Sequence, residues 1–327
     1  MKTIVHKFTE TKDHCFDTEV FNKEKIKEIA KDFHVHYDPK IEDIDLISAR
    51  FKPTIGEDLT ETKIDILSSN IFCDDHYVPI RIYQREDHSD KVILFIHGGG
   101  FITGKVTDKD EQCRYLAQES HAKIIAVEYR LAPETMFPGQ LNDCLAGIDA
   151  INQTDPSKLI LVGDSAGANL CVACCLKRPN RIDMAILLYG AFDLEEAEDT
   201  DYHWDYSLYE TDPSQENVIR NRLLRFKKLA ADMKRCYIPD QEDVRNELIS
   251  PYYSKHLDLL PRTLMIEAEF DYYRICNENF AQKLYDAGVD LEEIFYEGVD
   301  HAFLDSLGRI PQAKDCLDKI AEAVKKI

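Results

Sequence analysis

Residues 159–167 read Leu-Ile-Leu-Val-Gly-Asp-Ser-Ala-Gly, an apolar run that ends in a G-x-S-x-G motif. A short continuous run of Leu, Ile and Val is typical of a strand that is buried on both faces of a parallel sheet. The next residues, 166–178, are expected to form a helix. A serine on a tight, glycine-flanked turn between a strand and a helix is open to a base. The stretch therefore predicts a nucleophile elbow with Ser165 as the nucleophile.

Similar apolar runs surround this stretch on both sides. Strand-like runs alternate with helix-like patterns, which is typical of βαβ units around a parallel sheet. We therefore expect an α/β fold with a mostly parallel central sheet, helices on both of its faces and an antiparallel pair formed by its two earliest strands. The expected strands cover residues 63–67, 78–83, 92–96, 124–127, 159–162, 185–188, 264–268 and 291–296, and the expected helices cover residues 108–120, 139–152, 166–178, 273–287 and 311–327.

One interval lacks this alternation. Residues 194–260 contain helical segments and an aromatic cluster but no strand-like run. We expect an insertion of this size to form a helical cap over the carboxyl ends of the strands, where α/β folds bind ligands. The polar residues before the sheet include an expected helix over 23–33. The predicted organisation is an N-terminal helical cap segment, 1–50, and a catalytic domain, 51–327, which carries the cap insertion.

A second glycine-rich segment precedes the elbow: residues 96–101 read Ile-His-Gly-Gly-Gly-Phe. Attack of a serine on a carbonyl creates an oxyanion, which is stabilised by N–H donors that are already in place. Consecutive glycines let backbone amides approach a ligand without intervening side chains. A phosphate-binding turn is disfavoured, because neither a G-x-G-x-x-G nor a Walker pattern is present.

The elbow also requires a histidine base and a carboxylate, in the order Ser, acid, His. Three histidines follow the serine. His203 lies inside the expected cap, His256 precedes the strand that should carry the acid, and His301 follows the last strand-like run. His301 is therefore the predicted base.

The predicted acid is Asp271, which lies just past the carboxyl end of the strand expected at 264–268. Glu269 and Asp300 are its rivals. Glu269 is expected to point along the strand. Asp300 adjoins the base in sequence, which is awkward for a carboxylate that has to face the base's Nδ1 atom.

Taken in order, these motifs resemble the hormone-sensitive-lipase-like branch of the α/β-hydrolases, which includes bacterial carboxylesterases and acetyl esterases. The resemblance covers roughly residues 63–327. It is carried by His-Gly-Gly-Gly-Phe at 97–101, Tyr-Arg-Leu-Ala-Pro-Glu at 129–134, Gly-Asp-Ser-Ala-Gly at 163–167, Glu-Phe-Asp at 269–271 and Tyr-Glu-Gly-Val-Asp-His-Ala-Phe at 296–303.

The resemblance also implies roles for individual residues. It places the acid at Asp271, and it implies an oxyanion hole in which the amides of Gly99 and Gly100 join that of Ala166, the residue after the nucleophile. One departure is Ala168, where the family pattern usually has a further glycine. This position lies past the nucleophile, so the departure concerns the packing of the helix more than catalysis.

The amino-acid composition excludes some classes of binding partner. The 327 residues include 40 basic and 61 acidic side chains, and the net charge of −21 argues against nucleic acid and anionic membranes as partners. No apolar stretch approaches the ~20 residues of a membrane span, and the start lacks a secretory signal pattern. We therefore expect the ten cysteines to be reduced thiols in a cytosol. Cys171, Cys174 and Cys175, like His34 and His36, lack further ligands nearby, so no metal and no cofactor is expected.

The expected function is that of a serine carboxylic-ester hydrolase, cytoplasmic and monomeric or homodimeric, acting on small esters with short, acetyl-like acyl groups. An amidase or lactonase with the same triad is an alternative, and a small-molecule receptor on the same fold is another. The short-chain expectation rests on charged residues where an interfacial lipase lid would need apolar surface. These residues are Glu195, Glu196, Glu198, Asp199 and Asp201.

The aromatic cluster of the expected cap has two interpretations. Its rings either stack on a sugar or aryl group of the substrate or form the core of the cap, and the second interpretation is favoured. The cluster comprises Tyr202, Trp204, Tyr206 and Tyr209.

Overall fold

One sheet of nine strands organises the chain in a computed structural model that describes residues 2–9, 12–22, 50, 56–195 and 197–327. The strands are β1 (Lys2–Val5), β2 (Asp65–Cys73), β3 (His76–Gln84), β4 (Lys91–Ile96), β5 (Lys123–Val127), β6 (Lys158–Asp164), β7 (Met184–Leu188), β8 (Arg262–Phe270) and β9 (Leu291–Asp300). Their order across the sheet is β1-β9-β8-β7-β6-β4-β5-β3-β2. All neighbours are parallel except the β2–β3 and β3–β5 pairs, which are antiparallel.

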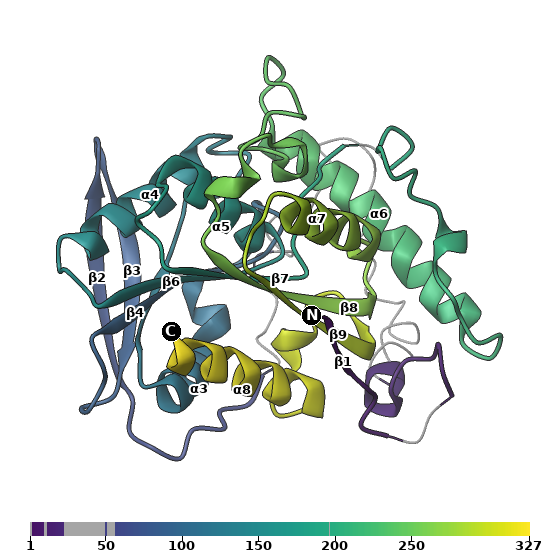
Figure 1. Cartoon of the computed structure of the whole chain (residues 1–327), viewed down its shortest axis with the longest axis horizontal. Coiled ribbons are helices and arrows are strands. Elements are labelled where there is room, and N and C mark those ends of the chain that lie inside the picture. Colours follow the sequence, from purple (N-terminus) through teal and green to yellow (C-terminus); the bar gives the residue numbers. More distant parts are fainter. Residues whose placement is uncertain (1, 10–11, 23–49, 51–55, 196) are drawn as a thin grey trace.

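Helices cover both faces of this sheet (Figure 1). They are α3 (Asp110–Ser120), α4 (Gly139–Asn152), α5 (Ala166–Lys177), α6 (Glu216–Tyr237), α7 (Arg274–Asp286) and α8 (Pro311–Lys326). Helices α3 and α8 lie on one face, and α4, α5 and α7 lie on the other. Because both faces are covered, the central strands consist mainly of buried apolar residues, and every residue of β7 is buried.

The structure confirms the predicted α/β fold and its antiparallel first pair. Each expected strand is present, as is each helix expected between residues 108 and 327, with ends that differ by a few residues. The strand β1 was not expected. It lies at the edge of the sheet with mostly exposed side chains, so its four residues lack the apolar run that marks the central strands.

The interval between β7 and β8 contains the long helix α6 and three short 3₁₀ turns, η3 (Tyr206–Leu208), η4 (Pro251–Tyr253) and η5 (Leu257–Leu259). It contains no strand among its described residues, in line with the sequence pattern. The helix expected over residues 23–33 lies outside the described residues, as does most of the N-terminal segment 1–50.

None of the helices in the described ranges combines the length and apolar character needed to cross a membrane. All ten cysteines are buried free thiols. Three of them, Cys171, Cys174 and Cys175, lie within α5 as small core residues.

Candidate active site

The turn between β6 and α5 presents Ser165 in a strained conformation, with φ 55° and ψ −116°. Few non-glycine residues adopt such a backbone, and it is typical of functional turns. Two glycines allow the close packing that the turn needs. A Cβ atom at Gly167 would overlap the carbonyl oxygen of Ile96, and one at Gly163 would overlap that of Gly167. The G-x-S-x-G spacing is thus a steric requirement where α5 meets β4 and β6.

Two further side chains form a hydrogen-bonded chain that starts at the serine hydroxyl. His301 follows β9, and its Nε2 atom lies 2.8 Å from the Oγ atom of Ser165. The Nδ1 atom of the same ring lies 2.8 Å from Oδ2 of Asp271, which follows β8. All three side chains are buried. The structure thus brings together three residues that are 30 and 136 positions apart in sequence.

The two rival carboxylates have other partners. Oε2 of Glu269 accepts a hydrogen bond of 2.7 Å from the amide of Gly298. Oδ2 of Asp300 accepts one of 2.8 Å from Nε of Arg222 in α6. Of the three candidate acids, Asp271 is the one bonded to the histidine ring.

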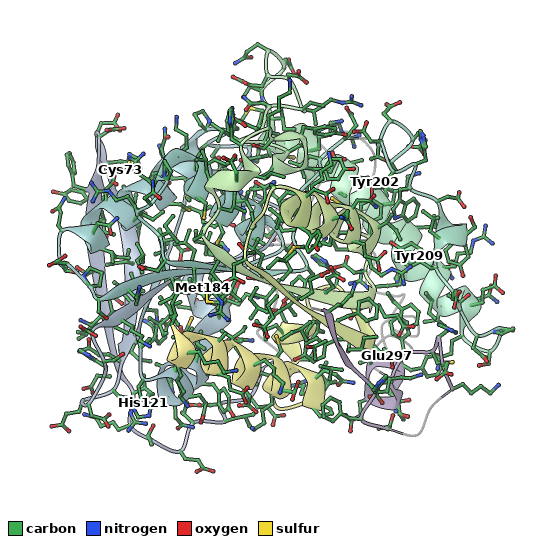
Figure 2. The ribbon with its side chains drawn as sticks, viewed as in Figure 1. Cys73, His121, Met184, Tyr202, Tyr209 and Glu297 are labelled. Atoms are coloured by element: carbon green, nitrogen blue, oxygen red, sulfur yellow. The ribbon has the colours of Figure 1, made fainter. Side chains whose placement is uncertain are left out.

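Aromatic side chains from the segment before α6 hold the loop that carries Asp271. The Tyr209 hydroxyl donates to the carbonyl oxygen of Asp271 at 2.7 Å, and Nε1 of Trp204 donates to that of Tyr272 at 3.1 Å. Both rings are buried. Figure 2 labels Tyr209 together with Tyr202, and both lie on the side of the molecule where α6 and α7 run. Tyr209 and Trp204 thus form part of the core and support the acid loop.

The glycine segment after β4 runs close to the elbow. Gly99 and Gly100 have positive φ angles of 121° and 60°. The amide of Gly98 donates to Oδ1 of Asp164 at 2.8 Å, which ties this segment to the residue before the nucleophile. His97, which is buried beside it, has its pKa lowered to about 4 by desolvation, so its ring is neutral at pH 7.

A buried lysine links these segments. Lys109 ends the 3₁₀ turn η2 (Val106–Lys109), and its Nζ atom lies 2.9 Å from Oδ2 of Asp164 and also contacts Oδ1 of Asp305. Burial alone would lower the pKa of Lys109, but the two carboxylates raise it above its ordinary value. The lysine is therefore charged, and it joins the elbow to the turn η6 (Phe303–Ser306) that follows His301.

Helix α6 lies across the site. The ring of Phe226 is centred 4.4 Å from the ring of His301. Further along, the Met233 side chain packs directly on Gly100, since a Cβ atom there would overlap the thioether sulfur. Tyr237, the last residue of α6, stacks on Phe101 with ring centroids 3.7 Å apart.

A cavity of about 180 Å³ lies between α6 and the segment after β7. The rings of Tyr272 and Tyr273 form one of its walls, and the Tyr273 ring is centred 5.7 Å from that of His301. Its other lining residues are Asp193, Leu194, Glu195, Ala197, Leu224, Lys227, Lys228, Ala230, Ala231 and Lys234. Desolvation raises the pKa of Asp193 to about 6.

Sequence reasoning named Ser165, Asp271 and His301 together with Gly99, Gly100 and Ala166, and these residues lie on segments that the structure brings to one end of the sheet. It missed the supporting residues. Lys109, Arg222 and Met233 act across large sequence separations, and no local motif marks them. In the sequence, Lys109 stands between Asp108 and Asp110, so its charge gave no sign of a buried position.

The fold and this site define an α/β hydrolase, and the comparisons agree. The family model described as alpha/beta hydrolase fold matches residues 93–305. The chain therefore belongs to the α/β-hydrolase family, in the hormone-sensitive-lipase-like branch that its motifs resemble.

Several related proteins are esterases or hydrolases. The chain is 30% identical over 245 residues to an arylesterase of Saccharolobus solfataricus, a match that covers 71% of this chain and 75% of the relative. It is 26% identical over 289 residues to an ethyl acetate hydrolase of Pseudomonas putida, with 77% and 80% covered. A hyperthermophilic esterase from the archaeon Pyrobaculum calidifontis superposes with a TM-score of 0.75 at 25% identity, covering 95% of this chain and 98% of that one. These relatives confirm the prediction that the chain is an enzyme of the serine-hydrolase class.

Proposed function

We propose that the protein is a serine carboxylic-ester hydrolase in which Ser165, His301 and Asp271 form the catalytic triad. The observation that carries this proposal is the continuous hydrogen-bonded chain from Ser165 Oγ through both ring nitrogens of His301 to Asp271, with 2.8 Å at each step. This geometry suits a base that removes the serine proton while a carboxylate stabilises the resulting imidazolium.

In the proposed reaction, Ser165 Oγ attacks the ester carbonyl as His301 takes its proton. The oxyanion of the tetrahedral intermediate accepts hydrogen bonds from the amides of Gly99, Gly100 and Ala166. His301 then protonates the leaving alcohol, and water hydrolyses the acyl-enzyme by the same steps. The hydrogen bond from the Gly98 amide to Asp164 supports an oxyanion-binding role for the glycine segment, because it holds this segment against the elbow before substrate binds.

We further propose short, acetyl-like acyl groups as substrates. Phe226 and Met233 of α6 lie against His301 and Gly100, so two side chains of this helix pack on the predicted base and on the glycine segment. The cavity of about 180 Å³ lies behind Tyr273, whose ring packs edge-on against Phe226 with centroids 5.6 Å apart. A long acyl chain would have to separate these two rings to enter it.

The residues 1–50 and the interval 194–260 are proposed to act together as the cap over the site. We also propose a cytosolic location, because the ten cysteines are free thiols. The proposed oligomeric state is a monomer or a homodimer.

An active-site titration tests the triad. We expect a fluorophosphonate to label the protein once, at Ser165, and to stop hydrolysis of p-nitrophenyl acetate in proportion to labelling. A receptor on the same fold could lack this reactivity. Failure to acylate under conditions in which the protein is folded would contradict the enzyme proposal.

The acyl preference is tested separately with p-nitrophenyl esters from about two to twelve carbons. Each methylene buried in a true acyl tunnel would add about 0.8 kcal/mol of binding, so a tunnel would show itself as a steep rise in kcat/KM with chain length. We expect a maximum between acetyl and butyryl. A maximum at eight carbons or more would overturn the short-chain proposal and leave the triad untouched.

A further inference from the structure

A hairpin at the far edge of the sheet carries a cysteine and a histidine in a C-x-x-H arrangement. Cys73 ends β2 and His76 begins β3, and the two residues are direct cross-strand partners. Asp74 and Asp75 form the two-residue turn between them, with Asp74 at φ 50°. The hairpin therefore places a thiol and an imidazole side by side on a rigid support.

A carboxylate from another element completes the group. Asp143 projects from α4, and its Oδ1 atom lies 2.8 Å from Nε2 of His76. The Sγ atom of Cys73, a ring nitrogen of His76 and a carboxylate oxygen of Asp143 all lie within 4.8 Å of one another. Cys73 is 6% exposed and Asp143 is 0% exposed, so these groups are shielded from bulk water. Thiolate, imidazole and carboxylate are the ligands that zinc takes in proteins.

The surrounding residues orient these three ligands. The second ring nitrogen of His76, Nδ1, lies 3.2 Å from the carboxylate of Asp75, the arrangement that fixes metal-binding histidines in most sites. The other oxygen of Asp143, Oδ2, accepts hydrogen bonds from the backbone amide and from Nε of Arg130, at 2.9 and 3.0 Å. At present Oδ1 contacts Nε2 of His76 at 2.8 Å and accepts from Nη2 and Nε of Arg130 at 2.8 and 3.2 Å. A cation at Oδ1 would replace these three bonds, while Oδ2 would keep its two donors.

A groove of about 330 Å³ opens beside the cluster. Cys73 and Asp74 line it on the hairpin side, and Asn142 lines it on the α4 side. His76 and Asp143 do not line it, so the groove reaches the cluster at Cys73, and an ion with a solvent molecule as its fourth ligand would approach from the thiol side. Figure 2 shows Cys73 at the edge of the molecule formed by β2, well away from the carboxyl ends of β8 and β9.

We propose that Cys73, His76 and Asp143 form a binding site for a thiophilic divalent cation of the zinc type. On binding, Cys73 loses its proton to solvent and its sulfur bonds the metal, neutral His76 contributes Nε2, and Asp143 contributes Oδ1. The charge of the cation is balanced by one thiolate and one carboxylate. The metal joins the β2–β3 hairpin to α4 and is independent of the ester-hydrolysing site.

Metal binding to the whole protein tests this proposal. Zn²⁺ is titrated in competition with a chromophoric chelator, Co²⁺ is added to look for a thiolate-to-cobalt absorption band, and thermal unfolding is followed with and without Zn²⁺. We expect one Zn²⁺ bound per chain, a cobalt–thiolate band and a rise in Tm.

Four variants test which side chains bind the metal. C73S should abolish the cobalt–thiolate band, and H76Q should abolish stoichiometric Zn²⁺ binding. D75N, which changes only the group behind the histidine, should weaken Zn²⁺ binding about 10–100-fold. H256A removes an exposed histidine from another part of the chain and should bind Zn²⁺ as the parent does.

The proposal is overturned if the parent protein binds no stoichiometric Zn²⁺, if its cobalt complex lacks the thiolate band, or if C73S and H76Q bind as tightly as the parent. If C73S does not fold, as judged by circular dichroism, the H76Q and D75N titrations decide the question. Retained binding in both would overturn the proposal.

Discussion

The two sides of the proposed active site are built in different ways. On the nucleophile side, the segments 96–101 and 163–167 lie at the ends of neighbouring strands, β4 and β6, and glycines let their backbones touch. On the acid side, Asp271 and His301 stand on loops after β8 and β9, and side chains from a distant segment hold them. Tyr209 and Trp204 bind the acid loop, and Arg222 binds the residue before the histidine.

This difference has a physical origin. Close backbone contact needs only the absence of side chains, which a short motif can encode. A loop that positions a carboxylate and an imidazole has carbonyl groups and charges of its own, and these have to find hydrogen-bond partners when they are buried. The partners come from the interval between β7 and β8, so substitutions of Trp204, Tyr209 and Arg222 should affect the acid side and leave the elbow intact.

The largest expected effect belongs to the nucleophile side. Ser165→Ala should lower kcat for p-nitrophenyl acetate by at least about 10⁴-fold, because catalysis by a triad collapses when its nucleophile is removed. The Tm should change little, since the substitution removes one hydroxyl. Steady-state kinetics and thermal unfolding measure the two quantities, and substantial residual turnover would exclude Ser165 as the nucleophile.

Lys109→Met tests the charge that links the two sides. It leaves the buried carboxylate of Asp164 without its partner, which typically costs about 3–5 kcal/mol of unfolding free energy. Lys105→Met is the matched control, because Lys105 is exposed and its ion pair with Asp108 is long at 3.8 Å, so its loss should cost less than about 1 kcal/mol. Chemical denaturation measures both, and equal losses would show that the buried network does not matter.

Tyr209→Phe tests the acid side alone. The change removes one of the two donors to the Asp271 carbonyl, the other being the amide of Arg274 at 3.1 Å, so we expect a loss of about 0.5–1.5 kcal/mol in stability and a fall in kcat with little change in KM. Tyr206→Phe is the control from the same segment, since its hydroxyl contacts Thr211 at 3.2 Å. A variant with unchanged kcat would mean that the acid loop keeps its position without Tyr209.

The smallest effect concerns pH. Burial raises the pKa of Glu267 in β8 to about 7, although Lys2 opposes the shift. Below about pH 4.5 the carboxyl is protonated in both the folded and the unfolded chain. As the pH rises from about 4.5 to 7, the carboxyl ionises in the unfolded chain but keeps its proton in the folded chain, so stability falls by at most about 1.4 kcal/mol per pH unit and levels off above pH 7.

Glu267→Gln should flatten this decline between about pH 4.5 and 7. Glu278→Gln is the control, because Glu278 also faces Lys2, at 4.0 Å, but is 40% exposed on its side chain. Denaturation series at several pH values compare the slopes. A parent protein whose stability rises over this window, or a Gln variant with the parental slope, would contradict the assignment to Glu267.

Most of the fold could be read from residue patterns. The runs of Val, Ile and Leu in β4, β6 and β7 and the helices between them follow directly from burial on both faces of a sheet. Strand β1 was not predicted, because an exposed edge strand needs no apolar pattern and is specified by its pairing with β9. The hydrogen bonds of Trp204 and Tyr209 could not be predicted either. The aromatic residue types indicated packing in a core, but they did not indicate which carbonyl groups the two side chains bind.

Local sequence was enough to specify the strand–turn–helix at Ser165, the glycine segment before it and the chain order of nucleophile, acid and base, because each depends on backbone sterics or on the end of a strand. The contact between the Asp271 carboxylate and the His301 ring, the buried Lys109 bridge and the closure of the site by α6 came from the folded chain, although Asp271 was already the acid predicted from the sequence. Those features join residues tens to more than a hundred positions apart. Their energies arise when burial removes water from charged and polar groups, which is a property of the assembled core and is absent from any single segment.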